Sequence, residues 1–260
     1  MTRFEGYAAL VTGAGQGIGA AVARRLAAEG ARVLVTDLDA ERARAVAAAV
    51  RADGGIAEAQ GCDVRDAAAV EAAVARAAEA FGSLDVLVNN AYSCHRDPDR
   101  FEEWDEAAWY EDFEVTLHGA ARCARAALPL LAAAPGRGAI VSVGSVNAEA
   151  HFGDHAYSAA KAGLASLTRT LAVESAPRGV RVNLVEPGTV RTDVWRERAA
   201  MLEEVSAHYP LGRVGEPSDI AAAVAFLASS DAAWITGVSL PVDGGLLVSN
   251  LAMNRTMAHG

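Results

Sequence analysis

The sequence is poor in cysteine, which limits the kinds of site it can build. Its three cysteines, Cys62, Cys94 and Cys123, lie far apart and form no CxxC pair. This pattern favours free thiols in a reducing compartment over a disulfide framework or a zinc site. His151 and His155 are four residues apart, but a glycine and an aspartate separate them in an expected loop, so we predict no metal site.

Long apolar runs and an excess of positive charge are also absent. No stretch approaches the roughly 18 consecutive apolar residues of a membrane span, and "MTRFEGYAALVTG" lacks the basic-then-apolar layout of a secretory signal. The 23 Lys and Arg against 33 Asp and Glu give a net charge of −10 and a pI near 5.1. These values argue against nucleic acid or a membrane as the main partner, and we expect a cytoplasmic protein.

What the sequence does have is an alternation of apolar and alanine-rich segments. Hydrophobic residues make up 52% of the chain and the mean hydropathy is +0.15, which allows a sizeable core. Strands are expected at 7–12, 31–37, 56–64, 84–90, 138–145, 180–188 and 238–245. Helices are expected at about 18–29, 40–52, 66–80, 105–134, 155–176 and 217–229. This repetition predicts an α/β fold, with a single domain over residues 1–260 and a doubly wound parallel sheet of about seven strands covered by helices on both faces.

Two segments are longer than a simple connection requires. Residues 91–104 and 189–216 each follow the C-terminal end of an expected strand, which is the edge where open α/β sheets bind ligands. We expect them to form a substrate pocket, with 189–216 as a lid; ordinary surface loops are the alternative. The moderately apolar C-terminal tail, 246–260, is expected to pack at a subunit interface.

A glycine-rich turn joins the first expected strand to the first expected helix. In "VTGAGQGIGAAVARRLAAEG" the glycines stand at positions 13, 15, 17 and 19. Residues without a Cβ allow the dihedrals of the turn and let the backbone approach a pyrophosphate closely. A helix that starts near Ile18 would present free N–H groups to the same anion. The strand–turn–helix context predicts a dinucleotide site that includes Gly13, Gln16, Gly17, Ile18 and Gly19.

An acidic residue ends the second expected strand. Asp37 can accept hydrogen bonds from the adenosine ribose hydroxyls and would repel a 2′-phosphate, and the glycine turn contains no basic residue. NAD is therefore favoured over NADP, although Arg42 lies on the next helix. A helix cap is the alternative role for Asp37, and Asp39 fits that role at least as well.

Tyr157 and Lys161 are four residues apart in "HAYSAAKAGL", so their side chains share one face of the expected helix. Taken alone, this spacing fits a proton-transfer pair and an inert helix face equally.

Several pieces of the sequence together resemble one protein family. They are "TGAGQGIG" (12–19), "CDV" (62–64), "NNA" (89–91), Ser145, "YSAAK" (157–161), "PGTVRT" (187–192) and "GRVGEPSDIAAAVAFLAS…ITG…LPVDGG" (212–245). In this order and strand context, they resemble the short-chain dehydrogenase/reductase family over nearly the whole chain. The resemblance implies a single Rossmann-type domain that binds a nicotinamide cofactor. It also implies an enzyme that interconverts alcohols and ketones by hydride transfer, commonly as a homotetramer, with a dimer as the other possibility.

The resemblance assigns the catalytic roles. Tyr157 would be the acid/base, and an ammonium at Lys161 would lower the pKa of its phenol and reach the nicotinamide ribose. Ser145 would hydrogen-bond the substrate oxygen; a strand-end hydroxyl that satisfies local backbone is the alternative, and Ser142 is less well placed inside the strand.

The resemblance also extends the cofactor site. Asp63 would contact the adenine amino group, Asn90 and Ala91 would lie beside the adenosine ribose, and Asn89 would tie neighbouring strands together. The later motif would place the Val190 backbone against the carboxamide and Thr192 near the pyrophosphate. The predicted cofactor-binding set is completed by Val64, Tyr157, Lys161, Pro187 and Gly188.

Two positions depart from the family pattern. Tyr92 stands where glycine usually follows "NNA", so it points into the substrate pocket or shifts the loop. Thr116 in "EVTLHGA" occupies the position of an asparagine whose backbone holds a relay water. Thr116 preserves that relay if the helix keeps a local distortion; otherwise a different relay, aided by His118, is the alternative. The twelve-residue gap between Ser145 and Tyr157 is one shorter than the common gap.

The leading hypothesis is an NAD-dependent dehydrogenase of a small-molecule secondary alcohol. The alternatives are a non-catalytic nicotinamide-binding sensor or scaffold, and a dihydrodiol or sugar dehydrogenase of the same family. A ring-bearing or polyol substrate is favoured over a long aliphatic chain, because the residues expected around it mix aromatic and hydrogen-bonding groups. These residues are Tyr92, Ser93, His151, Phe152, Trp195, His208 and Tyr209.

Overall fold

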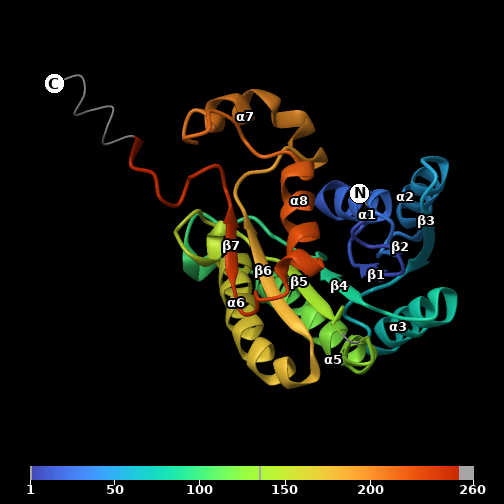
Figure 1. Cartoon of the computed structure of the whole chain (residues 1–260). Coiled ribbons are helices and arrows are strands. Elements are labelled where there is room, and N and C mark those ends of the chain that lie inside the picture. The colour runs from blue at the N-terminus through green and yellow to red at the C-terminus, as the bar shows by residue number, and fades with distance from the viewer. Residues whose placement is uncertain (1, 135, 252–260) are drawn as a thin grey trace.

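The computed structural model describes residues 2–134 and 136–251, and within them seven parallel strands form one sheet (Figure 1). The strand order is β3-β2-β1-β4-β5-β6-β7. The strands are β1 (Ala8–Val11), β2 (Arg32–Asp37), β3 (Ile56–Gly61), β4 (Val86–Asn89), β5 (Ala139–Val143), β6 (Arg181–Pro187) and β7 (Ser239–Val242). The predicted parallel α/β sheet is confirmed. Most strands are shorter at their C-terminal ends than the sequence suggests, so Asp63, Asn90 and Ser145 lie in the loops beyond them.

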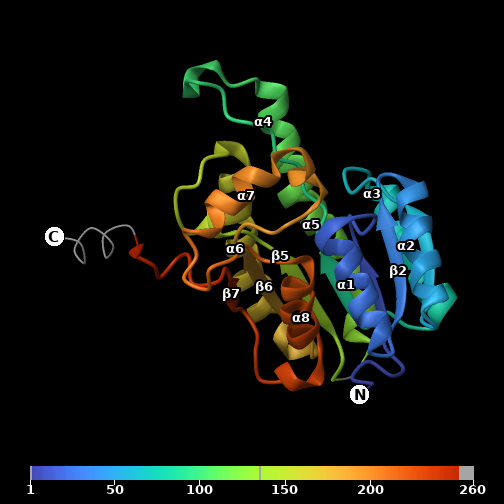
Figure 2. The same cartoon turned by 90° about the horizontal axis from the view of Figure 1, so that it is seen from above.

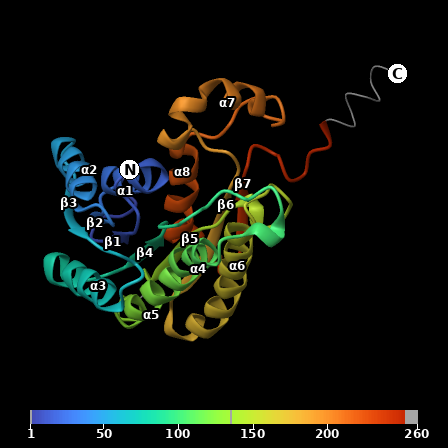
Figure 3. The same cartoon turned by 180° about the vertical axis from the view of Figure 1, so that it is seen from behind.

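Helices cover both faces of the sheet (Figures 1 and 3). They are α1 (Gly17–Ala28), α2 (Ala40–Ala52), α3 (Ala67–Phe81), α4 (Glu106–Phe113), α5 (Gly119–Ala132), α6 (His155–Ser175), α7 (Ala199–Ser206) and α8 (Pro217–Ala228). Residues of α1, α2 and α8 form one hydrophobic core with the sheet, and residues of α3 and α5 form another. Helices on both faces explain why β1, β4 and β5 are buried at every position.

Side chains at the helix starts fix where several helices begin. Asp39 accepts hydrogen bonds from two backbone N–H groups of α2, and Asp66 and Asp105 accept one each at α3 and α4. At α8, Glu216 and Asp219 form a reciprocal capping box ahead of the helix. Asp39, and not Asp37, is therefore the cap of α2, which leaves Asp37 for another role.

Two predicted segments have a different local structure. The helix expected at 105–134 is interrupted by a π-helix, Glu114–His118, between α4 and α5. The expected lid segment contains a 3-10 helix, Asp193–Arg198, followed by α7. Residues 252–260 of the expected interface tail lie outside the described residues. No helix of the described chain is long and apolar enough to cross a membrane.

The strand order reverses between β1 and β4, which places their following loops side by side at one edge of the sheet. The glycine turn follows β1, and the segment after β4 extends away from the sheet toward α4 (Figure 2). The ends of β5 and β6 lie next along the same edge.

Candidate active site

The glycine turn lies directly against the loop that follows β4. Gly13 has a positive φ of 59°, and a Cβ on it would lie 2.8 Å from the Cα of Ala91. A Cβ on Gly19 would lie 2.5 Å from the Nδ2 of Asn90. Neither position can accept a side chain without movement of the backbone. The turn is therefore a cradle of bare backbone at the start of α1, which fits the pyrophosphate of a dinucleotide.

Asn90 holds this cradle in shape. Its side-chain amide donates hydrogen bonds to the carbonyl oxygens of Thr12 (3.0 Å) and Gly13 (2.8 Å). The Thr12 hydroxyl in turn accepts from the backbone N–H groups of Asn90 (3.0 Å) and Ala91 (3.2 Å). The side chain of Asn90 thus contacts the turn, whereas the resemblance suggested only a place beside the ribose.

The neighbouring Asn89 points elsewhere. Its amide nitrogen lies 3.4 Å from the carbonyl oxygen of Ala120 and 3.5 Å from the hydroxyl of Ser142. It joins β4 to α5 and β5, the structural role expected for it. Ser142 is buried inside β5, consistent with its lower rank as a substrate contact.

Two backbone N–H groups orient the side chain of Asp37. Its carboxylate accepts a hydrogen bond from the N–H of Gly15 (2.9 Å) and another from the N–H of Asp39 (3.0 Å). Arg42 lies closer to the turn than its sequence position suggests, because a Cβ on Gly15 would lie 2.6 Å from the Cβ of Arg42. The Arg42 guanidinium faces Asp39 at 3.3 Å.

Asp63 is engaged by a neighbour. Arg65 contacts both carboxylate oxygens of Asp63 at 2.7–3.0 Å, and this hydrogen bonding holds the pKa of Asp63 below its usual value. An adenine amino group would have to use the remaining lone pairs. The adjacent Val64 is buried against the start of α5, where a Cβ on Gly119 would lie 2.6 Å from its Cγ2.

The segment after β6 crosses above the glycine turn. Pro187 ends the strand, and the N–H of Gly188 donates to Val242 at 3.3 Å. Val190 forms a β-bridge with Gly215. A Cβ on Gly17 would lie 3.4 Å from the Cγ2 of Thr192. Thr192 therefore lies beside the turn, as the predicted pyrophosphate contact requires.

Three side chains from two elements meet at the carboxyl end of β5. Ser145 is buried and lies two residues beyond the strand, while Tyr157 and Lys161 come from the first two turns of α6. Tyr157 lies near enough to Ser145 to interact with it, although the Ser145 hydroxyl itself donates to Oδ1 of Asn147 (3.0 Å) and accepts from the N–H of Asn147 (3.2 Å). The Nζ of Lys161 lies 5.4 Å from the centre of the Tyr157 ring and donates a hydrogen bond to the carbonyl oxygen of Val143.

Burial governs the protonation of the pair. It raises the pKa of Tyr157 well above its usual value, Tyr92 raises it further, and the interaction with Ser145 opposes both. Burial also lowers the pKa of Lys161 to about 7, since this amine is only 2% exposed. The sequence predicts that a charged Lys161 lowers the pKa of Tyr157. In the folded protein, burial instead favours the neutral form of each group.

Tyr92 points toward Tyr157 and Lys161, which is one of the two orientations that its place in the sequence allowed. Its ring packs edge-on against that of Tyr157, with centroids 5.8 Å apart, and the Lys161 Nζ lies 5.7 Å from the Tyr92 centroid. Tyr92 is 52% exposed, so one side of it remains open to a substrate.

The local helix distortion that a Thr116 relay requires is present. Thr116 sits at the middle of the π-helix, 1% exposed, where the backbone departs from the α-helical pattern. Its hydroxyl accepts a hydrogen bond from the N–H of Ser93 (3.1 Å) and donates one to the Ser93 carbonyl (3.2 Å). His118 is paired with Glu114 at 2.7 Å and half exposed, so it is not aimed at a relay.

The residues predicted around the substrate do not all lie together. Tyr92 and Ser93 lie beside Tyr157 and Thr116, while Phe152 is exposed in the loop before α6 and His151 precedes it. Tyr209 was wrong as a substrate contact: it is 3% exposed, packs against Gly188 and accepts a hydrogen bond from the N–H of Thr189. His208 is exposed beside it, and Trp195 lies partly buried in the 3-10 helix Asp193–Arg198.

Sequence reasoning missed Asp154 and Cys94. Asp154 is the one non-glycine residue with positive φ (55°) in the described chain, and its carboxylate lies near the thiol of Cys94. Both act electrostatically on Tyr157, so both lie close to it. Since residues 94 and 154 are far apart in the sequence, no local pattern could have joined them.

Comparisons with known proteins show which proteins this chain is similar to. Residues 13–247 match the family described as enoyl-(acyl carrier protein) reductase. The chain is 45% identical to cis-4-hydroxycyclohexanecarboxylate dehydrogenase of Sinomonas cyclohexanicum, over 93% of this chain and 97% of the relative. It is 42% identical to galactitol 2-dehydrogenase (L-tagatose-forming) of Cereibacter sphaeroides, over 95% and 97% respectively. A solved dehydrogenase/reductase of Sinorhizobium meliloti 1021 superimposes with a TM-score of 0.87 at 42% identity, over 93% of this chain and 95% of the other.

Proposed function

This chain belongs to the short-chain dehydrogenase/reductase family of nicotinamide-dependent oxidoreductases, and we propose that it interconverts a secondary alcohol and a ketone with Tyr157 as the acid/base. The observation that carries the proposal is the meeting of Ser145, Tyr157 and Lys161 beside the glycine cradle. The comparisons give no support to a non-catalytic sensor.

In this proposal the side chains handle the proton and hold the substrate oxygen. The Ser145 hydroxyl and the Tyr157 phenol both face that oxygen, and the phenol accepts the alcohol proton or returns it to the ketone. Lys161 stabilises the phenolate whenever its amine is protonated, and its hydrogen bond to Val143 keeps the amine at the end of β5. The nicotinamide, when bound, supplies the acceptor or donor of the hydride.

The proposed cofactor is NAD. Backbone groups of the glycine cradle, with Gly13, Gly17 and Gly19, would hold its pyrophosphate. The Asp37 carboxylate, oriented by Gly15 and Asp39, would accept from the ribose hydroxyls and disfavour a 2′-phosphate. Arg42 is occupied by Asp39, which supports the same preference.

The proposed substrate is a secondary alcohol on a ring or a polyol chain. Tyr92 offers an exposed aromatic surface at the catalytic tyrosine, and Asp154 and Cys94 add polar groups nearby. Relatives at more than 40% identity carry names for a hydroxylated cyclohexane and for galactitol, which supports this class.

Tyr157→Phe tests the mechanism. General acid–base catalysis contributes about 10² to 10⁴ in rate, so kcat should fall about a thousandfold in a spectrophotometric assay of NAD reduction. NAD binding, measured by calorimetry, should stay within about twofold because the ring remains. Tyr110→Phe is the matched control, since Tyr110 is 62% exposed on α4 and its hydroxyl bonds Glu106 and no other residue of the described chain. Undiminished turnover by the Tyr157 variant would exclude the proposed role.

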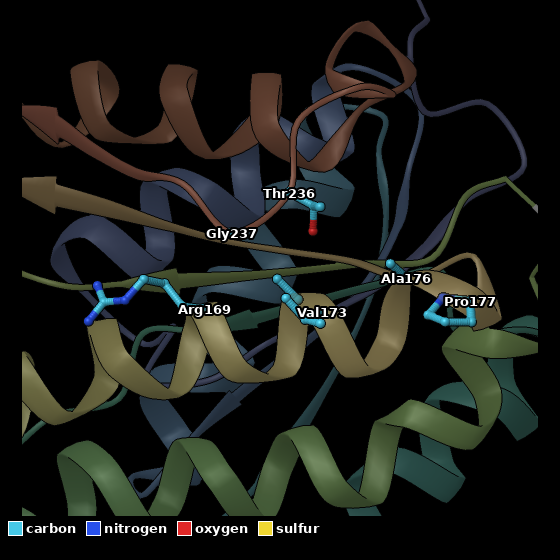
Figure 4. Close-up of a pocket in the computed structure, with 7 residues that line it drawn as sticks. Arg169, Val173, Ala176, Pro177, Thr236 and Gly237 are labelled. Atoms are coloured by element: carbon cyan, nitrogen blue, oxygen red, sulfur yellow. The ribbon is translucent and has the colours of Figure 1, made fainter.

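We further propose a cytoplasmic homotetramer. Figure 4 shows a groove along α6 with Val173 and Pro177 on its wall and Thr236 opposite. Val173 is 78% exposed and the nearby Trp234 is fully exposed, which leaves apolar surface available for a subunit contact. The free thiols of all three cysteines suit a reducing compartment. A mass of 26.8 kDa in light scattering, that of one chain, would contradict the assembly.

A further inference from the structure

We propose that a groove between the two long segments binds an anionic group of the substrate, a carboxylate, at a distance from the reacting carbon. This inference rests on the proposed function, because the groove is assigned to the same substrate. The groove has a volume of about 400 Å³. Its lining consists of Arg96, Asp193, Val194, Arg196, Glu197 and Arg198.

The two segments that build the groove also reach the proposed active site. Arg96 belongs to the segment that begins immediately after Asn90, and the 3-10 helix Asp193–Arg198 begins immediately after Thr192. Tyr92, four residues before Arg96, packs against Tyr157, and Thr192, which precedes Asp193, lies beside the glycine turn. In this proposal the substrate extends from Tyr157 toward Arg96.

The charge of the groove is opposite to that of the whole chain. The chain carries a net charge of −10, yet three guanidinium groups line the groove against the carboxylates of Asp193 and Glu197. Arg196 is neutralised by Asp193 at 2.7 Å. Of the remaining charged lining residues, Arg96 and Arg198 are positive and Glu197 is negative. The lining therefore carries a net positive charge, which favours an anion.

Two of these arginines have donors available for a ligand. Arg96 makes no hydrogen bond or ion pair with any residue in the described part of the chain, 2–134 and 136–251. Arg198 is stacked on Trp195, with its guanidinium carbon 4.8 Å from the ring centroid, and its one hydrogen bond is a long contact of 3.5 Å to Val194. Stacking fixes the plane of the guanidinium and leaves its edge N–H groups free, the geometry that suits a carboxylate.

The small size of the net charge favours a single carboxylate over a nucleotide or a polyanion. The groove also accommodates more than the carboxylate itself, and Val194 and the Trp195 ring give it apolar surface beside the charges. The geometry points to a ring alcohol that carries its hydroxyl at one end and its carboxylate at the other.

The test measures binding without turnover. Cyclohexanecarboxylate and its uncharged counterpart, cyclohexanecarboxamide, are titrated by calorimetry into the enzyme with saturating NAD. The acid should bind about tenfold more tightly than the amide, and the difference should shrink as salt is raised. Arg96→Ala should weaken acid binding about fivefold and Arg96→Ala/Arg198→Ala at least about tenfold, with amide binding unchanged.

Arg100→Ala is the matched control. Arg100 lies in the same segment, 71% exposed, and faces Glu102 outside the groove. It should leave both affinities unchanged. Equal binding of acid and amide, no detectable binding of the acid, or an equal loss in the Arg100 variant would each overturn the inference. Tyr157→Phe should bind the acid normally, so failure of the proposed chemistry and failure of the groove give different results.

Discussion

Thr116→Val tests how the segment carrying Tyr92 is held beside the catalytic tyrosine. Valine has nearly the shape of threonine but lacks the hydroxyl, so the change removes hydrogen bonds and leaves the packing of the π-helix intact. Thr116 is 1% exposed, and its hydroxyl contacts both backbone groups of Ser93, at 3.1 and 3.2 Å. Those two contacts are the only side-chain hydrogen bonds between the π-helix and this segment among the described residues.

The expected magnitude follows from those two bonds. Each lost hydrogen bond that leaves a partly buried backbone group unpaired costs about 1 to 1.5 kcal/mol. The free energy of unfolding should therefore fall by about 2 to 3 kcal/mol. Because Ser93 is next to Tyr92, loosening the segment should also raise KM several-fold, while Ser145, Tyr157 and Lys161 stay in place and kcat changes less.

Urea denaturation and steady-state kinetics together provide the assay. Thr116→Ser keeps the hydroxyl and should recover most of the loss in both measurements. Thr170→Val makes the same chemical change on the exposed face of α6. Among the described residues, the Thr170 hydroxyl bonds only the Ser166 carbonyl of the same helix, so this variant should change stability by less than about 0.5 kcal/mol. If Thr116→Val were as stable as the Thr170 variant, with an unchanged KM, the proposed support of Tyr92 would be refuted.

Two further predictions concern acidic residues. Glu186 on β6 is 1% exposed, and burial, followed by Glu149, raises its pKa to about 7 from 4.5. Between pH 4.5 and about 7, Glu186 is protonated in the folded protein and ionised in the unfolded chain. The loss of stability caused by its burial is therefore absent below pH 4.5, grows toward pH 7 and is complete above pH 7. Glu186→Gln should raise the free energy of unfolding by at most about 3 kcal/mol at pH 8 and hardly at all at pH 4; an equal gain at both pH values in urea titrations would contradict this. Asp37→Ser should raise the ratio of kcat/KM for NADP over NAD at least about tenfold, since a repelling charge is lost beside Arg42; an unmoved ratio would show that Asp37 does not set the preference.

The parts of the fold predicted from the sequence are those specified by local patterns. Strands β1, β4 and β5 are short apolar runs bounded by polar residues, and burial on both faces of a parallel sheet requires such runs. The positions of Gly13 and Gly19 were visible because only glycine fits where two loops approach so closely. The Tyr157–Lys161 pair was visible because both residues lie on one helix face.

The parts that could not be predicted depend on contacts between distant segments. The π-helix around Thr116 has an ordinary helical sequence, and nothing local shows that its hydroxyl will meet Ser93. Tyr209 looked like a pocket aromatic, but it is buried under the chain that follows β6, where it supports Thr189. The groove at Arg96 arises only when the segments after β4 and β6 come together across the edge of the sheet.

Burial also changes how Tyr157 and Lys161 act together. A spacing argument treats the lysine as a fixed positive charge that makes the phenol acidic, but burial brings the pKa of Lys161 to about 7. Near neutral pH about half of this amine is then uncharged, and a phenolate beside a neutral amine would be a lone buried charge. Loss of the Tyr157 proton is favourable only while Lys161 keeps its own, so the two groups titrate as a pair. The acidity that the proposed mechanism needs would therefore belong to the Tyr157–Lys161 pair together with Ser145, whose interaction with Tyr157 favours the phenolate.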